Sequence, residues 1–196
     1  MDFAQGACIA ALQPSFIRVE LARFVGIPQM MVVGLPTKAI SEAKERLIAI
    51  IKTLGLKLPH CRFLFNLYPV STTKYGSSLD LPMLVALLSS LGALKSTIIV
   101  SERQLWLGEL RLDGTVCPII GMPVILEAAA RLGYKEVWCS DQCLNQLAQQ
   151  DYGVKICTIN HISELVNLDA RHRSKLNGNL APPQKTSTSQ LSETGL

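Results

Sequence analysis

Apolar and polar residues alternate along the first part of the chain, which is the period of a β-strand with one buried face. Ile17, Val19 and Leu21 alternate there with Arg18 and Glu20. Proline and glycine punctuate the alternation and indicate turns between strands. We therefore expect a meander of three short strands over 7–12, 16–21 and 29–33.

From residue 37 the apolar spacing becomes that of an amphipathic helix, with its apolar stripe at Ile40, Ala43, Leu47, Ile51 and Leu54. Farther along, helical and strand patterns are interleaved. The pattern predicts helices over 79–91, 122–132, 142–149 and 162–168. It predicts strands over 62–68, 104–110, 136–139 and 155–158, with a hairpin that turns at 113–114 into 115–118. This order favours an α/β (α+β) domain with a mixed sheet.

Composition sets the domain organisation. The chain has 196 residues, 48% hydrophobic and 17% charged, which suits one well-packed domain and excludes a multi-domain machine. We expect that domain over 1–170 and a disordered basic tail over 171–196, rich in Asn, Pro, Ser and Thr. The body carries 15 basic and 14 acidic residues, whereas the tail carries four basic residues and one acidic residue. Contact with nucleic acid is therefore expected to be weak, salt-sensitive and confined to the tail.

Targeting and metal signals are weak. No apolar run approaches the roughly 18 residues that span a bilayer, and the N-terminus lacks a signal-peptide layout, so we expect a cytoplasmic protein without a membrane partner. Six cysteines in apolar settings are expected to be reduced, and Cys139 and Cys143 lack further ligands for a metal. Three scattered histidines are interpreted as surface or capping residues: His60, His161 and His172.

Nucleotide-binding motifs fail on spacing. The segment 92–97 ends like a P-loop, but Leu94 and Ser89 stand where the motif needs glycine. A dinucleotide GxGxxG fingerprint is also missing. We therefore expect no cofactor and no ATP hydrolysis by this chain alone.

A serine at the start of a predicted helix is the strongest candidate for chemistry. The segment 74–82 reads Lys-Tyr-Gly-Ser-Ser-Leu-Asp-Leu-Pro and follows a strand and a turn. Such a serine is often a helix cap worth about 1 kcal/mol. Catalysis would instead require a His or Lys base within hydrogen-bond reach.

Several short motifs in order resemble the N-terminal domain of the YifB/ComM group of magnesium-chelatase-like AAA+ ATPases, over about residues 5–168. They read Val-Val-Gly-Leu-Pro at 32–36, Asn-Leu-Tyr-Pro at 66–69, the segment 74–82, Gly-Glu at 108–109 and Asp-Gly at 113–114. The motif positions are Gly34, Pro36, Asn66, Lys74, Gly76, Ser78, Asp80, Pro82, Gly108, Glu109, Gly114, Pro118 and Gly121.

This resemblance implies a fold shared with the Lon protease domain, GHMP kinases and a ribosomal protein domain. Lon-type proteases use a Ser-Lys dyad, and the matching positions here are Ser78 for the nucleophile and Pro123 for the lysine. Proline cannot act as a base, which predicts an unreactive Ser78. Lys74 is the remaining candidate base. Asp80 is expected to favour the positive end of its helix, and Asn66 and Lys74 to hold the loop by hydrogen bonds.

Family members continue into an ATPase module with a P-loop, which these 196 residues lack. The leading hypothesis is thus a non-catalytic Lon-like domain that serves as an interaction or assembly module for an AAA+ ATPase or for its own oligomer. The family implies DNA processing during natural transformation. Two alternatives stay open: a divergent serine hydrolase that uses Ser78, and a truncated remnant.

Overall fold

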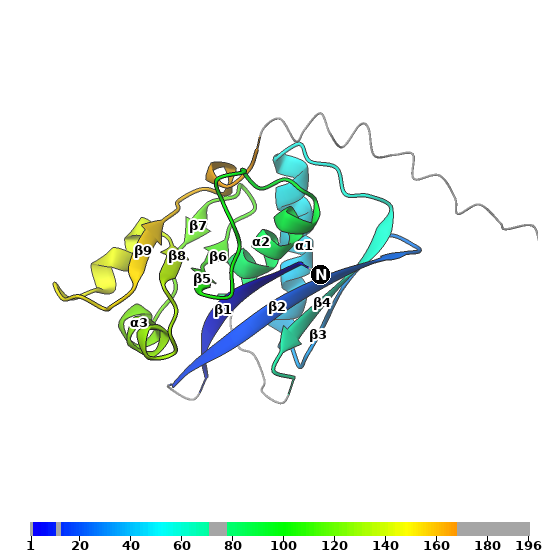
Figure 1. Ribbon diagram of the computed structural model, residues 1–196. Helices are drawn as coiled ribbons and strands as arrows, with labels where there is room; N and C mark the ends of the chain where they lie inside the picture. Colours follow the sequence, from blue (N-terminus) through cyan, green and yellow to red (C-terminus); the bar gives the residue numbers. More distant parts are fainter. Residues whose placement is uncertain (1, 11–12, 71–77, 168–196) are drawn as a thin grey trace, which may run out of the picture.

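The computed structural model describes residues 2–10, 13–70 and 78–167. Its main element is a seven-stranded mixed sheet with the strand order β3-β4-β2-β1-β5-β8-β9 (Figure 1). Among these strands β2 alone runs opposite to the other six. The strands are β1 (Asp2–Ala10), β2 (Gln13–Val25), β3 (Gln29–Val33), β4 (Cys61–Tyr68), β5 (Gln104–Leu107), β8 (Glu136–Cys139) and β9 (Lys155–Thr158).

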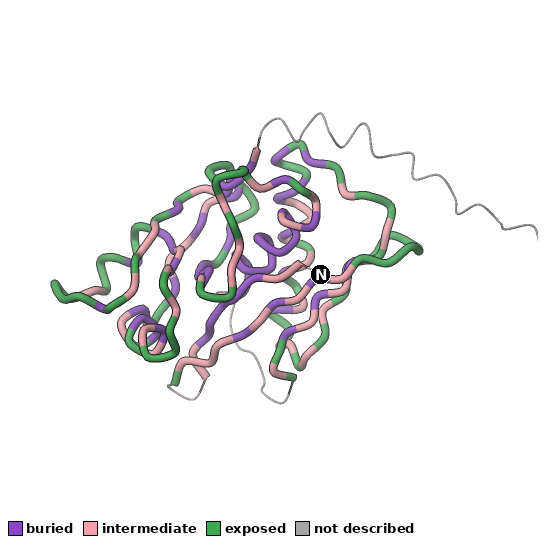
Figure 2. Tube along the Cα trace, in the orientation of Figure 1, coloured by how far each residue is buried: buried purple, intermediate pink, exposed green. Residues whose placement is uncertain are grey.

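Helices cover one face of the sheet along most of its width and the other face only in part. The first face packs against α1 (Lys38–Thr53) and α2 (Asp80–Ser90), and its core includes Trp106 of β5. The second face packs against α3 (Met122–Arg131) where β1, β5 and β8 run. Figure 2 shows the purple buried positions of β1 and β5 enclosed between these layers. The domain thus has three layers around β1 and β5 and two layers around β3 and β4.

Burial explains the composition of the two longer helices. Residues Asp80–Leu88 of α2 and Ser90 are all buried, because α2 packs on β1, β2 and β5 and also contacts α1 and β6, and nine of these ten residues are uncharged. In contrast, α1 buries one stripe and exposes Lys38 and Glu42 to solvent. The mixed α/β class and the three longest predicted helices are therefore confirmed.

The predicted strand over 104–110 is confirmed in extent but is broken at Gly108, where the chain leaves the main sheet. The strand β5 ends at Leu107, and β6 (Glu109–Leu110) pairs with β7 (Val116–Cys117) in a separate two-stranded sheet. A Cβ atom at Gly108 would lie 2.7 Å from Val116 Cγ1, so the glycine permits this close crossing.

Two predicted C-terminal helices were wrong in type and length. The first is a 3₁₀ helix, η1 (Asp141–Gln146), and the second is a single 3₁₀ turn, η2 (Ile162–Glu164). After η2 the chain turns and pairs with the segment that follows α2 in the sequence. Val166 forms an antiparallel β-bridge with Leu94, and the Asn167 amide donates to the Ala93 carbonyl. Tertiary hydrogen bonds thus replace the helical ones.

Smaller expectations have mixed outcomes. His161 caps η2 through its ring nitrogen, as expected for a capping histidine. None of the helices in the described part of the chain is both long and apolar enough to cross a membrane. The predicted tail over 171–196 lies outside the described residues, so its disorder and its nucleic-acid contact stay predictions.

The close approach of β1 to α2 yields a stability prediction. A Cβ atom at Gly6 would lie 2.7 Å from Pro82 Cγ and 2.9 Å from Leu79 Cδ2. Gly6→Ala should therefore lower the free energy of unfolding by about 1–3 kcal/mol, as overpacking does elsewhere. Urea denaturation measures this loss. A Gly6→Ala variant as stable as the parent protein would contradict the packing account.

Candidate functional site

The motif positions gather where strands of the sheet end. Six of the seven strands share one direction, so their carboxyl ends meet at a single edge, where α/β proteins commonly bind ligands. The segment 34–36 leaves β3 there, Asn66 lies near the end of β4, and Gly108 follows β5. Ser78 comes to the same edge, because its hydroxyl reaches the backbone of β1 at Ala7.

Ser78 is held by backbone partners on two sides. Its Oγ donates a hydrogen bond to the Ala7 carbonyl oxygen at 3.0 Å. Its own carbonyl accepts from the Gly108 amide at 3.5 Å, and the Leu81 amide donates to the Gly108 carbonyl at 3.1 Å. Ser78 therefore lies just before α2 and ties that helix to β1 and to the residue after β5.

The hydroxyl of Ser78 lacks an activating base among the described residues. A nucleophilic serine must pass its proton to a basic group, and a peptide carbonyl is too weakly basic to take it. Within 2–10, 13–70 and 78–167, no lysine, histidine or carboxylate makes a hydrogen bond to Ser78 Oγ. The alternative base Lys74 and the motif position Gly76 lie outside the described residues.

The resemblance to Lon-type proteases predicts Pro123 at the position of the dyad lysine, and in the structure Pro123 lies in the first turn of α3. It is the second residue of α3, where the fixed φ of proline suits a helix and its missing N–H costs no helical hydrogen bond. Gly121 caps this helix with a φ of 86°, and a Cβ atom there would lie 3.1 Å from Ile9 Cγ1. Both residues therefore begin a helix, and neither side chain can move a proton.

A buried ion pair fixes the start of α2. Arg46 of α1 donates from Nε to Asp80 Oδ2 and from Nη2 to Asp80 Oδ1, each at 2.8 Å. The Leu110 amide donates to Asp80 Oδ2 at 3.3 Å. Asp80 is 1% exposed, so its carboxylate binds α1 and β6 to the first turn of α2 out of contact with water.

The electrostatics of this pair follow from burial. Loss of solvation raises the pKa of the Asp80 carboxyl above its ordinary value, while the hydrogen bonds from Arg46 oppose that shift. The hydrogen bond to Asp80 raises the pKa of Arg46, which keeps the guanidinium charged. The expected helix-dipole role of Asp80 is therefore accompanied by a bidentate ion pair that its position in the sequence did not indicate.

The other motif positions have structural neighbours. Gly34 adopts a φ of 97° and passes so close to the Leu67 backbone that a side chain would collide with it. The Asn66 side chain donates to Glu20 Oε2 at 2.9 Å, so it joins two strands rather than holding a loop as expected. Gly114 packs on Ile162. Of the rest, Pro82 is buried, Pro36 and Pro118 are half-buried, and Glu109 is exposed.

Two residues that stabilise this region carried little signal in the sequence. Arg46 stands on the polar side of the predicted helix, and its partner lies 34 positions away. Gly6 lies outside the strand predicted over 7–12, although its missing side chain admits Pro82 and Leu79. The sequence contained one indication of a buried ion pair. Arg46 stands beside the apolar stripe of its helix, and Asp80 is the one charged residue of an apolar helix.

The described residues hold no cluster of metal-ligating side chains. Cys139 and Cys143 share a hydrogen bond that lowers the pKa of Cys143 to about 7 and raises that of Cys139. Both thiols are fully buried beneath α3 and η1. This pair therefore has no access to a substrate in the folded domain.

Comparison with known proteins identifies the class. Residues 19–142 match the family described as subunit ChlI of Mg-chelatase, and the chain belongs to that family. It is 32% identical over 134 residues to an uncharacterized protein of Mycobacterium tuberculosis (strain H37Rv), covering 68% of this chain and 26% of that protein.

Two further relatives match the resemblance seen in the motifs. The uncharacterized protein YifB of Escherichia coli (strain K12) is 31% identical over 125 residues, with 64% of this chain and 24% of YifB covered. Competence protein ComM of Haemophilus influenzae is 28% identical over 136 residues, with 69% of this chain and 26% of ComM covered. The chain thus spans about a quarter of the length of these curated relatives.

The buried ion pair predicts a pH-dependent loss of stability. Arg46→Met leaves the Asp80 carboxylate buried without its partner, which should cost about 2–4 kcal/mol near pH 8, toward the low end for buried pairs because Arg46 is partly exposed. Without Arg46, the pKa of Asp80 in the folded state rises further above its unfolded value. Stability is then present below the unfolded pKa and is lost as pH rises through the folded pKa.

The destabilisation by Arg46→Met should therefore be smaller near pH 5 than near pH 8, as measured by urea denaturation at both values. Arg46→Met combined with Asp80→Leu is the matched control, because it removes the stranded charge and should recover part of the stability without this pH dependence. A single variant whose loss is independent of pH would contradict the ion-pair account.

Proposed function

We propose that this ChlI-family domain is a non-catalytic interaction and assembly module that works with an AAA+ ATPase. The observation that carries the proposal is the hydrogen bond from Ser78 Oγ to the Ala7 carbonyl, at the position where a related protease fold would hold its nucleophile. The hydroxyl is used to fasten α2 to β1. Pro123 supports the same conclusion, because it places a helix-starting residue where a base would be needed.

Internal packing accounts for the motif positions that reach the carboxyl edge of the sheet. Asp80 binds Arg46, Gly108 permits a close crossing, and Gly34 lies against the Leu67 backbone. A substrate site would instead be expected to leave some polar groups directed at an open cavity. These contacts support the view that the sequence motifs maintain the fold of the domain. The domain would then act through the binding of partner proteins to its surface.

The ATPase partner and the process are part of the proposal. The resemblance to YifB and ComM implies a P-loop motor, and the chain matches about a quarter of those proteins. ComM is named a competence protein, and we extend the proposal to an assembly that handles DNA during natural transformation. Residues 1–170 carry 15 basic and 14 acidic side chains, an excess of only one basic charge, so we assign the main DNA contact to the ATPase motor.

A fluorophosphonate probe tests the absence of catalysis. Such probes label serines that a neighbouring base activates. We expect no labelling of this protein under conditions that fully label an active serine hydrolase mixed into the same sample. Labelling that Ser78→Ala abolishes would overturn the proposal in favour of a serine hydrolase.

The same substitution has a structural consequence. Ser78→Ala removes the donor to the Ala7 carbonyl and should lower the free energy of unfolding by about 1 kcal/mol. Ser96→Ala is a control in an exposed turn, where a smaller loss is expected because its hydroxyl makes no hydrogen bond to a described residue. Unfolding curves in urea measure both. A Ser78→Ala variant as stable as the parent protein would show that the hydroxyl has no fastening role.

A further inference from the structure

One edge strand of the main sheet has no charged residue and no proline within it. The strand β3 is outermost and, among the described residues, pairs with β4 alone (Figure 1). Its five residues, Gln29–Val33, include no charge and no proline. Soluble proteins commonly protect such edges with lysine, proline or a bulge, because an exposed edge strand can pair with another chain.

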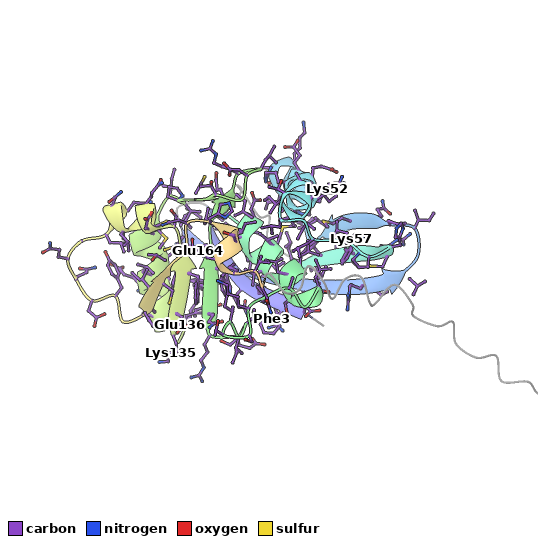
Figure 3. All side chains as sticks on the ribbon, turned by 90° about the horizontal axis from the view of Figure 1, so that it is seen from above. Phe3, Lys52, Lys57, Lys135, Glu136 and Glu164 are labelled. Carbon is purple, nitrogen blue, oxygen red and sulfur yellow. The ribbon has the colours of Figure 1, made fainter. Side chains whose placement is uncertain are left out.

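The opposite edge of the same sheet shows the protection that β3 lacks. The strand β9 has four residues, and Lys155 lies in it beside Glu136 of β8 at 2.9 Å. Figure 3 shows Glu136 and Lys135 far from Lys57, which follows α1 near the β3 end of the sheet. A charged pair at one edge and a neutral strand at the other indicate that β3 is the edge open to pairing.

Exposed apolar side chains follow β3 on the sheet face that the helices leave uncovered. Met30 is buried under the helical layer, whereas Met31 and Val33 point away from it and are more than one third exposed. Ile27 and Leu35 stand two residues before and two residues after the strand, and they are 79% and 55% exposed. The edge therefore has apolar groups at its centre and at both of its ends.

This arrangement is complementary to itself. If two copies of β3 pair antiparallel, the register that uses all five residues places Met31 opposite Met31 and Gln29 opposite Val33. The same register brings Ile27 of each copy toward Leu35 of the other. No charge meets a like charge, because the segment from Gly26 to Pro36 has none.

The neighbouring strands extend the apolar contact. Met31 lies beside Leu64 of β4, and Leu64 lies beside Ala22 of β2, on the face opposite α1 and α2. In an edge-to-edge pair, this row would continue without interruption from one copy into the next. Backbone hydrogen bonds would supply the affinity and the apolar row would exclude water from them.

We propose that a second copy of this chain is the partner of β3, so that two sheets join edge to edge about a twofold axis that passes beside Met31. The inference rests on the proposed function as an assembly module and names the surface and the partner. Each copy then gives and receives the same contacts, which is the isologous arrangement of closed dimers.

Sedimentation velocity over a wide range of concentrations tests the pairing. The protein should shift with rising concentration from a monomer of 21.4 kDa toward twice that mass. Met31→Lys places two like charges opposite each other, as does Met31→Glu, and each should raise the dissociation constant about tenfold or more. Met31 is already partly exposed, so both variants should fold, and thermal unfolding checks this.

A mixture of the two variants gives the sharpest result. Residue 31 faces its own counterpart only across the twofold axis, so Met31→Lys mixed with Met31→Glu should form a heterodimer while each variant alone stays monomeric. Ile99→Lys is the matched control, since it charges another exposed isoleucine away from β3 and should dimerise like the parent protein.

Three outcomes would overturn the inference. The first is a parent protein that stays monomeric at all concentrations. The second is an oligomer that Met31→Lys leaves unchanged. The third is an oligomer that Met31→Lys weakens and Met31→Glu strengthens, because that would indicate pairing with a basic surface such as the Lys155 edge.

The experiments distinguish a failure of the β3 pairing from a failure of the proposed non-catalytic function. A monomeric protein that the fluorophosphonate probe leaves unlabelled loses only the β3 pairing. A dimer whose Ser78 is labelled retains the pairing and refutes the non-catalytic role.

Discussion

The buried ion pair between Arg46 and Asp80 is the constraint on which the helical layer depends. A carboxylate with almost no exposure costs several kcal/mol to bury unless its lone pairs are filled, and here two guanidinium hydrogen bonds and the Leu110 amide fill them. Those three donors come from α1 and β6. The charge at Asp80 therefore fixes the position of the first turn of α2 relative to α1 and β6. An apolar contact of equal area is less directional and would restrain that position less.

The position of Ser78 follows from that constraint. Once the first turn of α2 is fixed, the residue two places before Asp80 lies against β1, and its hydroxyl meets the Ala7 carbonyl. Gly6 beside it admits Pro82 and Leu79. Under the proposed function this geometry holds a serine without a base, because the hydrogen-bond partners of Ser78 among the described residues are backbone atoms and Pro123 has no ionisable group.

The sequence predicted those elements whose pattern is set by one-sided burial. The strand 16–21 and the helix around Leu47 were recognised because each buries one face at a regular spacing. The predictions were wrong where contacts between residues far apart in the sequence determine the secondary structure. Gly108 ends β5 because Val116 crosses it, and the chain after Glu164 pairs with the segment behind α2 instead of continuing a helix. The Arg46 partnership joins residues 34 positions apart, which no local period reports.

The uneven cover of the sheet supports the proposed assembly role. The helix α3 covers the second face at β1, β5, β8 and the start of β2, and leaves it open at β4 and β3. That open half has polar groups where Arg18 bridges Glu20 and Glu102, but it becomes apolar toward Met31 at the uncharged edge. A domain that acted alone would gain from a charge at that edge, as Lys155 provides at the other. Its absence favours an edge that meets a partner.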